Sequence, residues 1–180
     1  MNAKRARHAA ALALEGLIVV ALLLLFFLRV PQVAGRSMEP QLYGGEHVLI
    51  NTLSYDVRIG PWRVAHLRDV RHGDVVAFVH DTGGDAEIYL KRVIGTPGDV
   101  ISFDRGSVIL NGRRLAESYA IRQDGPTLAS RIVGPHELFV LGDNRAESDD
   151  SRTFGTIAES DVIGRAALIV WPPGRARPIR

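Results

Sequence analysis

The stretch "EIYLKRVIG", residues 87–95, predicts a β-strand, because it is rich in β-branched and aromatic residues and ends at a glycine. Alternation along a strand places Lys91 and Arg92 on opposite faces. If one face packs on a core, at least one of these cations is partly buried; alternatively, the strand lies at a sheet edge with one cation in solvent. A buried lysine has a lowered pKa, so its neutral amine can act as a general base.

The chain around this strand also predicts β-structure. The turn signals "DRG" at 104–106 and "NG" at 111–112 predict an antiparallel meander over residues 100–115. Residues 53–66 form a longer insertion with Trp62, which either packs in the core or lies at a membrane interface. The other predicted strands are "HVLIN" (47–51), "DVVAFVH" (74–80), "DVISFD" (99–104), "HELFVLGDN" (136–144) and "VIGRAALIVW" (162–171).

The N-terminal segment 9–28, "AAALALEGLIVVALLLLFFL", is long enough as a helix to cross the ~30 Å core of a bilayer. The basic residues Lys4, Arg5 and Arg7 precede it and predict an N-terminus inside and a main domain outside. A cleavable signal peptide would also fit this pattern. We favour a retained anchor, because the full spanning length is present.

Composition excludes several kinds of chemistry. The 180-residue chain suits one domain and contains no cysteine, which removes disulfides, thiol nucleophiles and thiolate metal sites. The net charge is only +2 with scattered basic residues, which argues against nucleic-acid binding. The six histidines show no H-E-x-x-H motif or ligand spacing, so we expect no metal and no cofactor.

The segment "VAGRSMEPQLYGG", residues 33–45, holds a lone serine, Ser37. It lacks the G-x-S-x-G elbow, and no histidine lies in a triad context. A serine with a desolvated lysine is a known nucleophile–base pair, so Ser37 and Lys91 are candidates. The residues alone do not show whether positions 37 and 91 meet.

Four motifs follow the N-terminal segment in a fixed order: "SMEP" (37–40), "GDVV" (73–76), "KRVIGTPGD" (91–99) and "GDNRAESDDSR" (142–152). In these motifs and their order, the chain resembles the bacterial type I signal peptidases, from its N-terminal segment to Trp171. This resemblance implies a mostly β fold: one transmembrane α-helix precedes an antiparallel β-sheet catalytic domain with a small β-annex. The implied segments are a cytoplasmic N-terminus (1–8), an anchor (9–28) and a peptidase domain (29–180) with its annex at 99–135.

The resemblance also implies site residues. Ser37 matches the nucleophile, Lys91 the general base, and Ser148 the serine that hydrogen-bonds the lysine amine. The resemblance implies that the backbone N–H of Ser37 is an oxyanion donor, and Gly35 stands where some members carry a hydroxyl that serves as a second one. The implied substrate-binding residues are Gly35, Met38 and Tyr89. The implied supporting residues, expected to include an Asp-Arg ion pair beneath the dyad, are Asp143, Asn144, Arg145, Asp150 and Arg152.

The implied function is a membrane-anchored serine endopeptidase that removes signal peptides from exported preproteins after small residues at −1 and −3. The implied partners are those signal peptides, the lipid bilayer and the protein translocon, with no nucleic acid. The implied location is the bacterial cytoplasmic membrane, single-pass, with the catalytic domain on the extracytoplasmic side. The alternatives are a self-cleaving repressor or mutagenesis protein, a peptidase of conjugative transfer, and a catalytically idle anchored β-scaffold.

Overall fold

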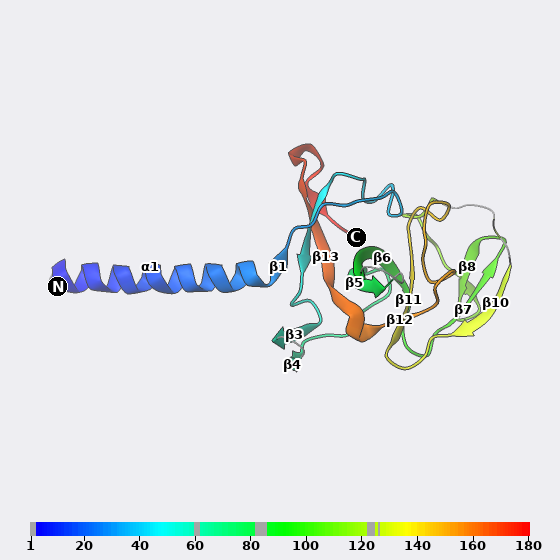
Figure 1. The fold of residues 1–180 in the computed structure, drawn as a ribbon, viewed down its shortest axis with the longest axis horizontal. Coiled ribbons are helices and arrows are strands. Elements are labelled where there is room, and N and C mark those ends of the chain that lie inside the picture. The colour runs from blue at the N-terminus through cyan, green and yellow to red at the C-terminus, as the bar shows by residue number, and fades with distance from the viewer. Residues whose placement is uncertain (1–2, 60–61, 82–85, 122–124, 126) are drawn as a thin grey trace.

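The computed structural model describes residues 3–59, 62–81, 86–121, 125 and 127–180. The described chain is mostly antiparallel β, which confirms the predicted fold class in that respect (Figure 1). The main sheet has the order β1-β2-β13-β5-β6-β11-β12, and β14 pairs with β13. Its strands are β1 (Leu28–Arg29), β2 (His47–Asn51), β5 (Val75–Asp81), β6 (Ala86–Gly95), β11 (Glu137–Leu141), β12 (Ile157–Ala158), β13 (Val162–Trp171) and β14 (Arg177–Pro178).

Strand β6, which carries both cations, lies inside the main sheet between β5 and β11. Lys91 is 2% exposed and Arg92 is 1% exposed, so the edge-strand alternative is wrong and both cations are buried. Both faces of β6 are covered, because Val93 packs in one core cluster and Ile94 in another. The second cluster includes Ile101 and Phe103 from the smaller sheet, which therefore covers the face that carries Arg92.

The smaller sheet has the order β10-β7-β8-β9 and lies at the end of the molecule opposite the N-terminal helix (Figure 1). Its turns place Arg105–Gly106 and Asn111–Gly112 in the positive-φ region that tight hairpins require, which confirms the predicted meander. This sheet occupies the stretch 99–135 where the annex is predicted. Its strand β10 does not correspond to any predicted strand. The strands are β7 (Val100–Asp104), β8 (Ser107–Leu110), β9 (Arg113–Arg114) and β10 (Leu128–Ile132).

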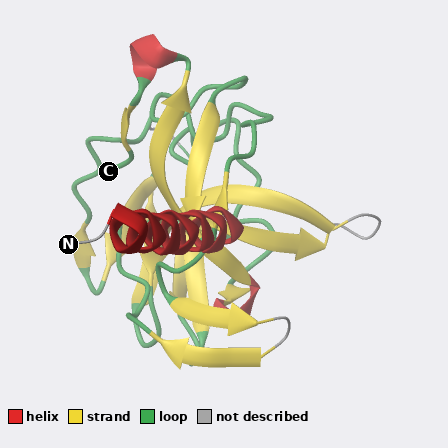
Figure 2. Ribbon diagram, turned by 90° about the vertical axis from the view of Figure 1, so that its left-hand side faces the viewer, coloured by secondary structure: helices red, strands yellow, loops and turns green. Residues whose placement is uncertain are grey.

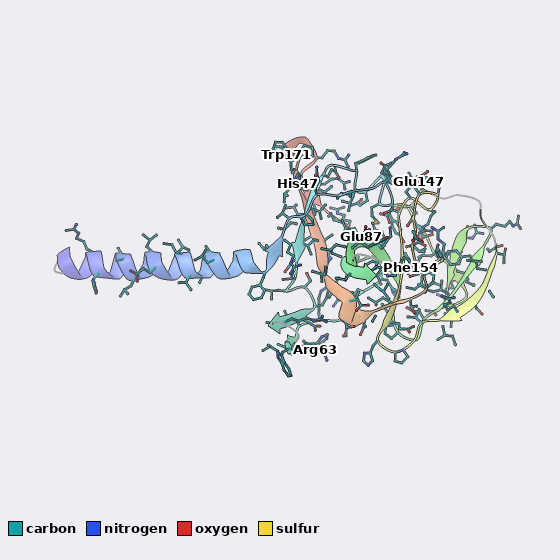
Figure 3. The ribbon with its side chains drawn as sticks, viewed as in Figure 1. His47, Arg63, Glu87, Glu147, Phe154 and Trp171 are labelled. Atoms are coloured by element: carbon teal, nitrogen blue, oxygen red, sulfur yellow. The ribbon has the colours of Figure 1, made fainter. Side chains whose placement is uncertain are left out.

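The insertion at 53–66 forms a hairpin of β3 (Asp56–Ile59) and β4 (Trp62–His66). Every residue of β4 is exposed, and Trp62 is 76% exposed, so the core-packing alternative for Trp62 is wrong. Its neighbour Arg63 lies on the side of the β-domain from which the N-terminal helix projects, as does Trp171 (Figure 3). Two short 3-10 helices, Glu159–Asp161 and Pro173–Arg175, flank β13.

The helix α1 (Ala3–Phe26) overlaps most of the predicted segment 9–28 and projects away from the β-domain (Figures 1 and 2). Its apolar side chains between Leu12 and Leu22 are exposed. Among the residues that the structure describes, no helix combines the length and the apolar character that crossing a membrane requires. The membrane-spanning part of the fold prediction is therefore unsupported by the structure.

Candidate active site

The main feature of the site is a contact between Ser37 and Lys91, which are 54 residues apart. Lys91 Nζ donates to Ser37 Oγ at 2.8 Å. Lys91 reaches this position because β6 is an internal strand of the main sheet and the Lys91 side chain is buried on one of its faces. Burial lowers the pKa of Lys91 to about 8, against the opposing influence of Asp150 and Asp149. The neutral fraction of the amine near physiological pH is therefore far larger than for an ordinary lysine, and the neutral form has a lone pair available for a proton.

The backbone around Ser37 is held from two sides. On one side, Met38 and Leu42 are buried in a core cluster with Val48, and Leu42 N donates to Met38 O at 2.8 Å. On the other side, Asn144 N donates to Ser37 O at 2.9 Å, and Asn144 Nδ2 donates to Arg36 O at 3.3 Å. The predicted supporting residue Asn144 therefore binds the backbone of Ser37, the predicted nucleophile, directly.

The segment after β11 packs directly against this backbone. A Cβ added to Gly142 would lie 2.5 Å from Ser37 O and 2.5 Å from Ser148 Cβ, so only glycine fits there. Gly142 N donates to Asp150 Oδ2 at 3.0 Å, and Arg152 Nε donates to Asp150 Oδ1 at 2.8 Å. The Asp150–Arg152 pair thus fixes the strand end that contacts Ser37; Glu147, which lies between Gly142 and Asp150 in the chain, is labelled in Figure 3.

Ser148 lies against Gly142, close to the site, but its hydrogen bonding differs from the prediction. Its Oγ is buried and has no hydrogen-bond partner among the described residues. The predicted bond from Ser148 to the lysine amine is therefore not formed in this structure. Ser148 lies close to Gly142, because the chain between residues 142 and 148 turns back and brings the two residues together.

Asp143 forms a second Asp-Arg ion pair beside Asp150–Arg152, and its partner is Arg92, which is not one of the predicted supporting residues. Arg92 Nε and Nη2 each donate to one carboxylate oxygen of Asp143 at 2.7 Å, and both side chains are fully buried. Burial raises the pKa of Asp143, and the bidentate bond from Arg92 opposes that rise. Arg92 also donates to Gly73 O at 2.8 Å, which joins the "GDVV" motif to the same network.

Sequence reasoning missed the partner of Arg145. Its guanidinium forms a buried, bidentate ion pair with Glu117, a residue of the 115–121 segment that no motif marks. Tyr119, from the same segment, places its ring 4.1 Å from the Arg92 guanidinium. The available signal was indirect: Arg145 is a cation in a segment predicted to be ordered, and a buried cation needs a counter-charge.

The three predicted substrate-binding residues lie around the dyad in different ways. Gly35 has open space where a side chain would stand, and Tyr89 is half-buried with its ring 5.4 Å from Lys91 Nζ. Burial raises the pKa of Tyr89, and Glu87 and Asp149 add to that rise. Met38 is buried in the core instead of facing solvent. Within the described part of the chain, no cluster of His, Cys, Asp or Glu could hold a metal ion.

This geometry can support acyl transfer, because a hydroxyl nucleophile faces a desolvated base in a site that packing holds rigid. Comparison with known proteins gives the same class. The family model "Signal peptidase, peptidase S26" matches residues 6–171. The chain therefore belongs to the signal peptidase family, peptidase S26, and is a serine peptidase, a hydrolase of the signal peptidase I type.

Signal peptidases from two organisms agree with the family assignment. Signal peptidase I of Bacillus caldolyticus is 35% identical over 168 residues, which cover 86% of this chain and 85% of the relative. Signal peptidase IB of Staphylococcus aureus is 30% identical over 178 residues, with 86% of each chain covered. The crystal structure of a signal peptidase I from Enterococcus faecalis matches with a TM-score of 0.47 and 27% identity, covering 55% of this chain and 97% of that one.

Proposed function

We propose that this chain is a membrane-anchored endopeptidase that removes signal peptides from exported preproteins, with Ser37 as nucleophile and Lys91 as general base. The observation that carries the proposal is the 2.8 Å contact between Lys91 Nζ and Ser37 Oγ, made by a lysine that burial keeps partly neutral. A buried lysine is costly to keep, and a use as a base explains why the cost is tolerated.

In the proposed reaction, neutral Lys91 accepts the hydroxyl proton as Ser37 Oγ attacks the scissile carbonyl carbon. The resulting ammonium returns this proton to the leaving amine, the C–N bond breaks, and an acyl-enzyme ester remains. Water then attacks the ester while Lys91 accepts a proton from it. The ester C–O bond breaks and the proton returns to Ser37 Oγ, which restores the enzyme.

The substrate is proposed to lie extended beside residues 32–36 and 88–91 and to add main-chain hydrogen bonds to these segments. Gly35 and Tyr89 would then border the cleavage region. Small residues at −1 and −3 would be selected because shallow pockets exclude larger side chains by steric clash. The supporting residues Asp143, Asn144, Arg145, Asp150 and Arg152 would hold the nucleophile and the base in register.

The membrane part of the proposal places α1 in the cytoplasmic membrane as a single-pass anchor, N-terminus inside. Its support is the twenty-residue apolar run at 9–28, the basic residues before it and the exposure of the apolar side chains from Leu12 to Leu22. Leu28 is nine residues from Ser37, so the nucleophile would lie within about 30 Å of the bilayer. Translocated signal peptides, delivered by the translocon, would present their cleavage sites at that height.

The test uses the full chain reconstituted in vesicles with a preprotein that carries an Ala-x-Ala site. We expect the wild type and the control Ser130→Ala, at an exposed serine of β10, to release the mature protein, and Ser37→Ala and Lys91→Ala to release none. A preprotein with leucine at −1 should remain intact. Mass spectrometry of the products identifies the bond that is cut. Cleavage by Ser37→Ala at the wild-type rate would rule out the proposed nucleophile, and no cleavage by the wild type would favour an idle scaffold.

A further inference from the structure

Glu117 lies in the segment between β9 and the chain's return to the main sheet, and its carboxylate is buried. Arg145 Nη1 donates to Glu117 Oε2 at 3.1 Å, and Arg145 Nη2 donates to the other oxygen. Tyr119 Oη also donates to Glu117, at 3.3 Å. A buried carboxylate with this complete set of donors is costly to assemble, and no catalytic step proposed above uses it.

The ion pair holds the Arg145 guanidinium against the backbone of Gly142, which packs on the backbone of Ser37. Arg145 Nε donates to Gly142 O at 3.0 Å, so the guanidinium joins Glu117 to the strand end that packs on Ser37 O. The peptide chain makes a second connection: Ile121 N donates to Asp143 O at 2.8 Å, and Arg145 N donates to Ile121 O at 3.3 Å. Together these bonds clamp residues 143–145 from the annex side.

The clamped residues include Asn144, whose N–H donates to Ser37 O at 2.9 Å. A second contact involves the residue next to Lys91. The Tyr119 ring stacks on the guanidinium of Arg92, which follows Lys91 on β6. The segment of residues 117–121 therefore contacts the supports of both members of the dyad, although it touches neither Ser37 nor Lys91 directly in any contact of the described chain.

We infer that Glu117 is a positioning residue for the Ser37–Lys91 pair: it holds Arg145, and through Gly142 and Asn144 it sets the position of the Ser37 backbone. This inference rests on the proposed function of Ser37 and Lys91. It also gives the annex a role in catalysis, because the annex segment supplies the anion that completes the site. Removing that anion leaves Arg145 buried without a counter-charge, and the guanidinium must shift toward water.

The test compares Glu117→Gln with the matched control Glu137→Gln. Glu137 also has a carboxylate that accepts structural hydrogen bonds, from Gly134 N and Thr156 Oγ1. Within the described part of the chain, these bonds do not involve residues 143–145. In the vesicle assay we expect Glu117→Gln to lower kcat by about 10- to 100-fold, since a small displacement of a reacting group has effects of that size. The KM of Glu117→Gln should stay within about threefold of wild type, and Glu117→Asp should recover part of kcat.

Two further measurements separate positioning from a general loss of stability. Hydrogen exchange of the Asn144 amide, which reports its bond to Ser37 O, should accelerate in Glu117→Gln and stay slow in Glu137→Gln. The double variant Glu117→Gln/Arg145→Met removes both charges and should regain thermal stability while kcat stays low, because the bond to Gly142 O is still missing.

The exchange measurement needs no activity, so it tests the positioning role even if the wild type cleaves no preprotein and the proposed function fails. An unchanged Asn144 exchange rate in Glu117→Gln would overturn the inference. Recovery of wild-type kcat together with stability in the double variant would also overturn it, since Glu117 would then matter for folding alone.

Discussion

Lys91 Nζ lies 2.8 Å from Ser37 Oγ, and the lysine that makes this contact is almost completely removed from solvent. The two residues come from a loop and a central strand that are 54 positions apart. Removal from water lowers the pKa of the amine, and contact with the hydroxyl gives the neutral amine a proton to accept.

The first prediction concerns the pH dependence of cleavage. Burial lowers the pKa of Lys91 to about 8, and only the neutral amine can accept the Ser37 proton. We expect kcat/KM to rise with pH through about 8 and then level, and a pH series on the vesicle-bound enzyme measures it. A profile that is flat between about pH 6 and 10 would contradict the assignment of Lys91 as base.

The second prediction concerns stability. Between about pH 8 and its ordinary pKa of 10.5, folded Lys91 binds fewer protons than in the unfolded chain, so stability rises with pH in that window. Below about pH 8, burial of the charged amine lowers the free energy of unfolding by about 3 kcal/mol. Lys91→Met should therefore raise the free energy of unfolding near neutral pH while activity is lost. Denaturant unfolding measures the gain, which should shrink as the pH approaches 10.5; a gain that is independent of pH would contradict the prediction.

The third prediction concerns Gly142, which packs against the nucleophile. A Cβ at this position would lie 2.5 Å from Ser37 O, so Gly142→Ala should displace the Ser37 backbone and lower kcat by at least about 100-fold. Gly174→Ala is the control, because its Cβ would meet nothing within 4 Å. Both variants are assayed for preprotein cleavage, and wild-type kcat in Gly142→Ala would contradict the close packing that the structure describes.

The fourth prediction concerns the oxyanion hole. Gly35 has nothing within 4 Å of its Cβ position, so Gly35→Ser should fold normally and supply a hydroxyl near the reacting carbonyl. If the Ser37 N–H is the sole donor, kcat should rise by about tenfold, which is less than the roughly 100- to 1,000-fold that a well-placed donor contributes. Gly35→Ala adds the Cβ without the hydroxyl and should not raise kcat. An equal kcat in both variants would mean that the added hydroxyl does not reach the oxyanion.

The fifth prediction concerns the side of the β-domain that would face the bilayer if α1 is the proposed anchor. Trp62 and Trp171 are both exposed and lie on the side from which α1 projects (Figures 1 and 3). In vesicles that contain brominated lipid, we expect quenching of Trp62 fluorescence in the Trp171→Phe variant, because tryptophan favours the interface. Quenching at the depth of the hydrocarbon core, or none at all, would contradict an interfacial hairpin.

A control for this experiment places a tryptophan at the opposite end of the molecule. Ile132, on β10 of the annex, is 69% exposed and tolerates a larger side chain. Ile132→Trp in the Trp62→Phe/Trp171→Phe background should escape quenching. Strong quenching at position 132 would show that the assay does not report orientation.

Much of the β-structure is predictable because it depends on local patterns. The alternation and the turn residues of the segment 100–115 require an antiparallel meander, since Asn–Gly and Arg–Gly accept the positive φ angles of tight turns. The strand at 162–171 has the predicted bounds. The hairpin that carries Trp62 and the strand β10 were not predicted, because few of their side chains are buried and local pattern follows burial.

The candidate site shows a similar division. Ser37, Lys91 and the "GDNRAESDDSR" segment are marked by their sequence motifs, and the structure brings them together. The pairing among the charged residues was not predictable: Asp143 selects Arg92, Asp150 selects Arg152, and Arg145 selects Glu117. Partner choice among buried charges depends on which side chains the packed strands bring within hydrogen-bond distance, and motif spacing carries no such information.

The amino-acid sequence was sufficient for the class of protein, through the order of its four motifs and their resemblance to a known family. It was also sufficient for the nucleophile and base candidates and for most strands, because these depend on residue type and local periodicity. The burial of both Lys91 and Arg92, the unbonded hydroxyl of Ser148 and the clamp from Glu117 to Ser37 required the folded chain. These features arise because the smaller sheet covers the face of β6 that carries Arg92, while a core cluster of the main sheet covers the face that carries Lys91. The desolvation that lowers the pKa of Lys91 exists only after both faces are covered.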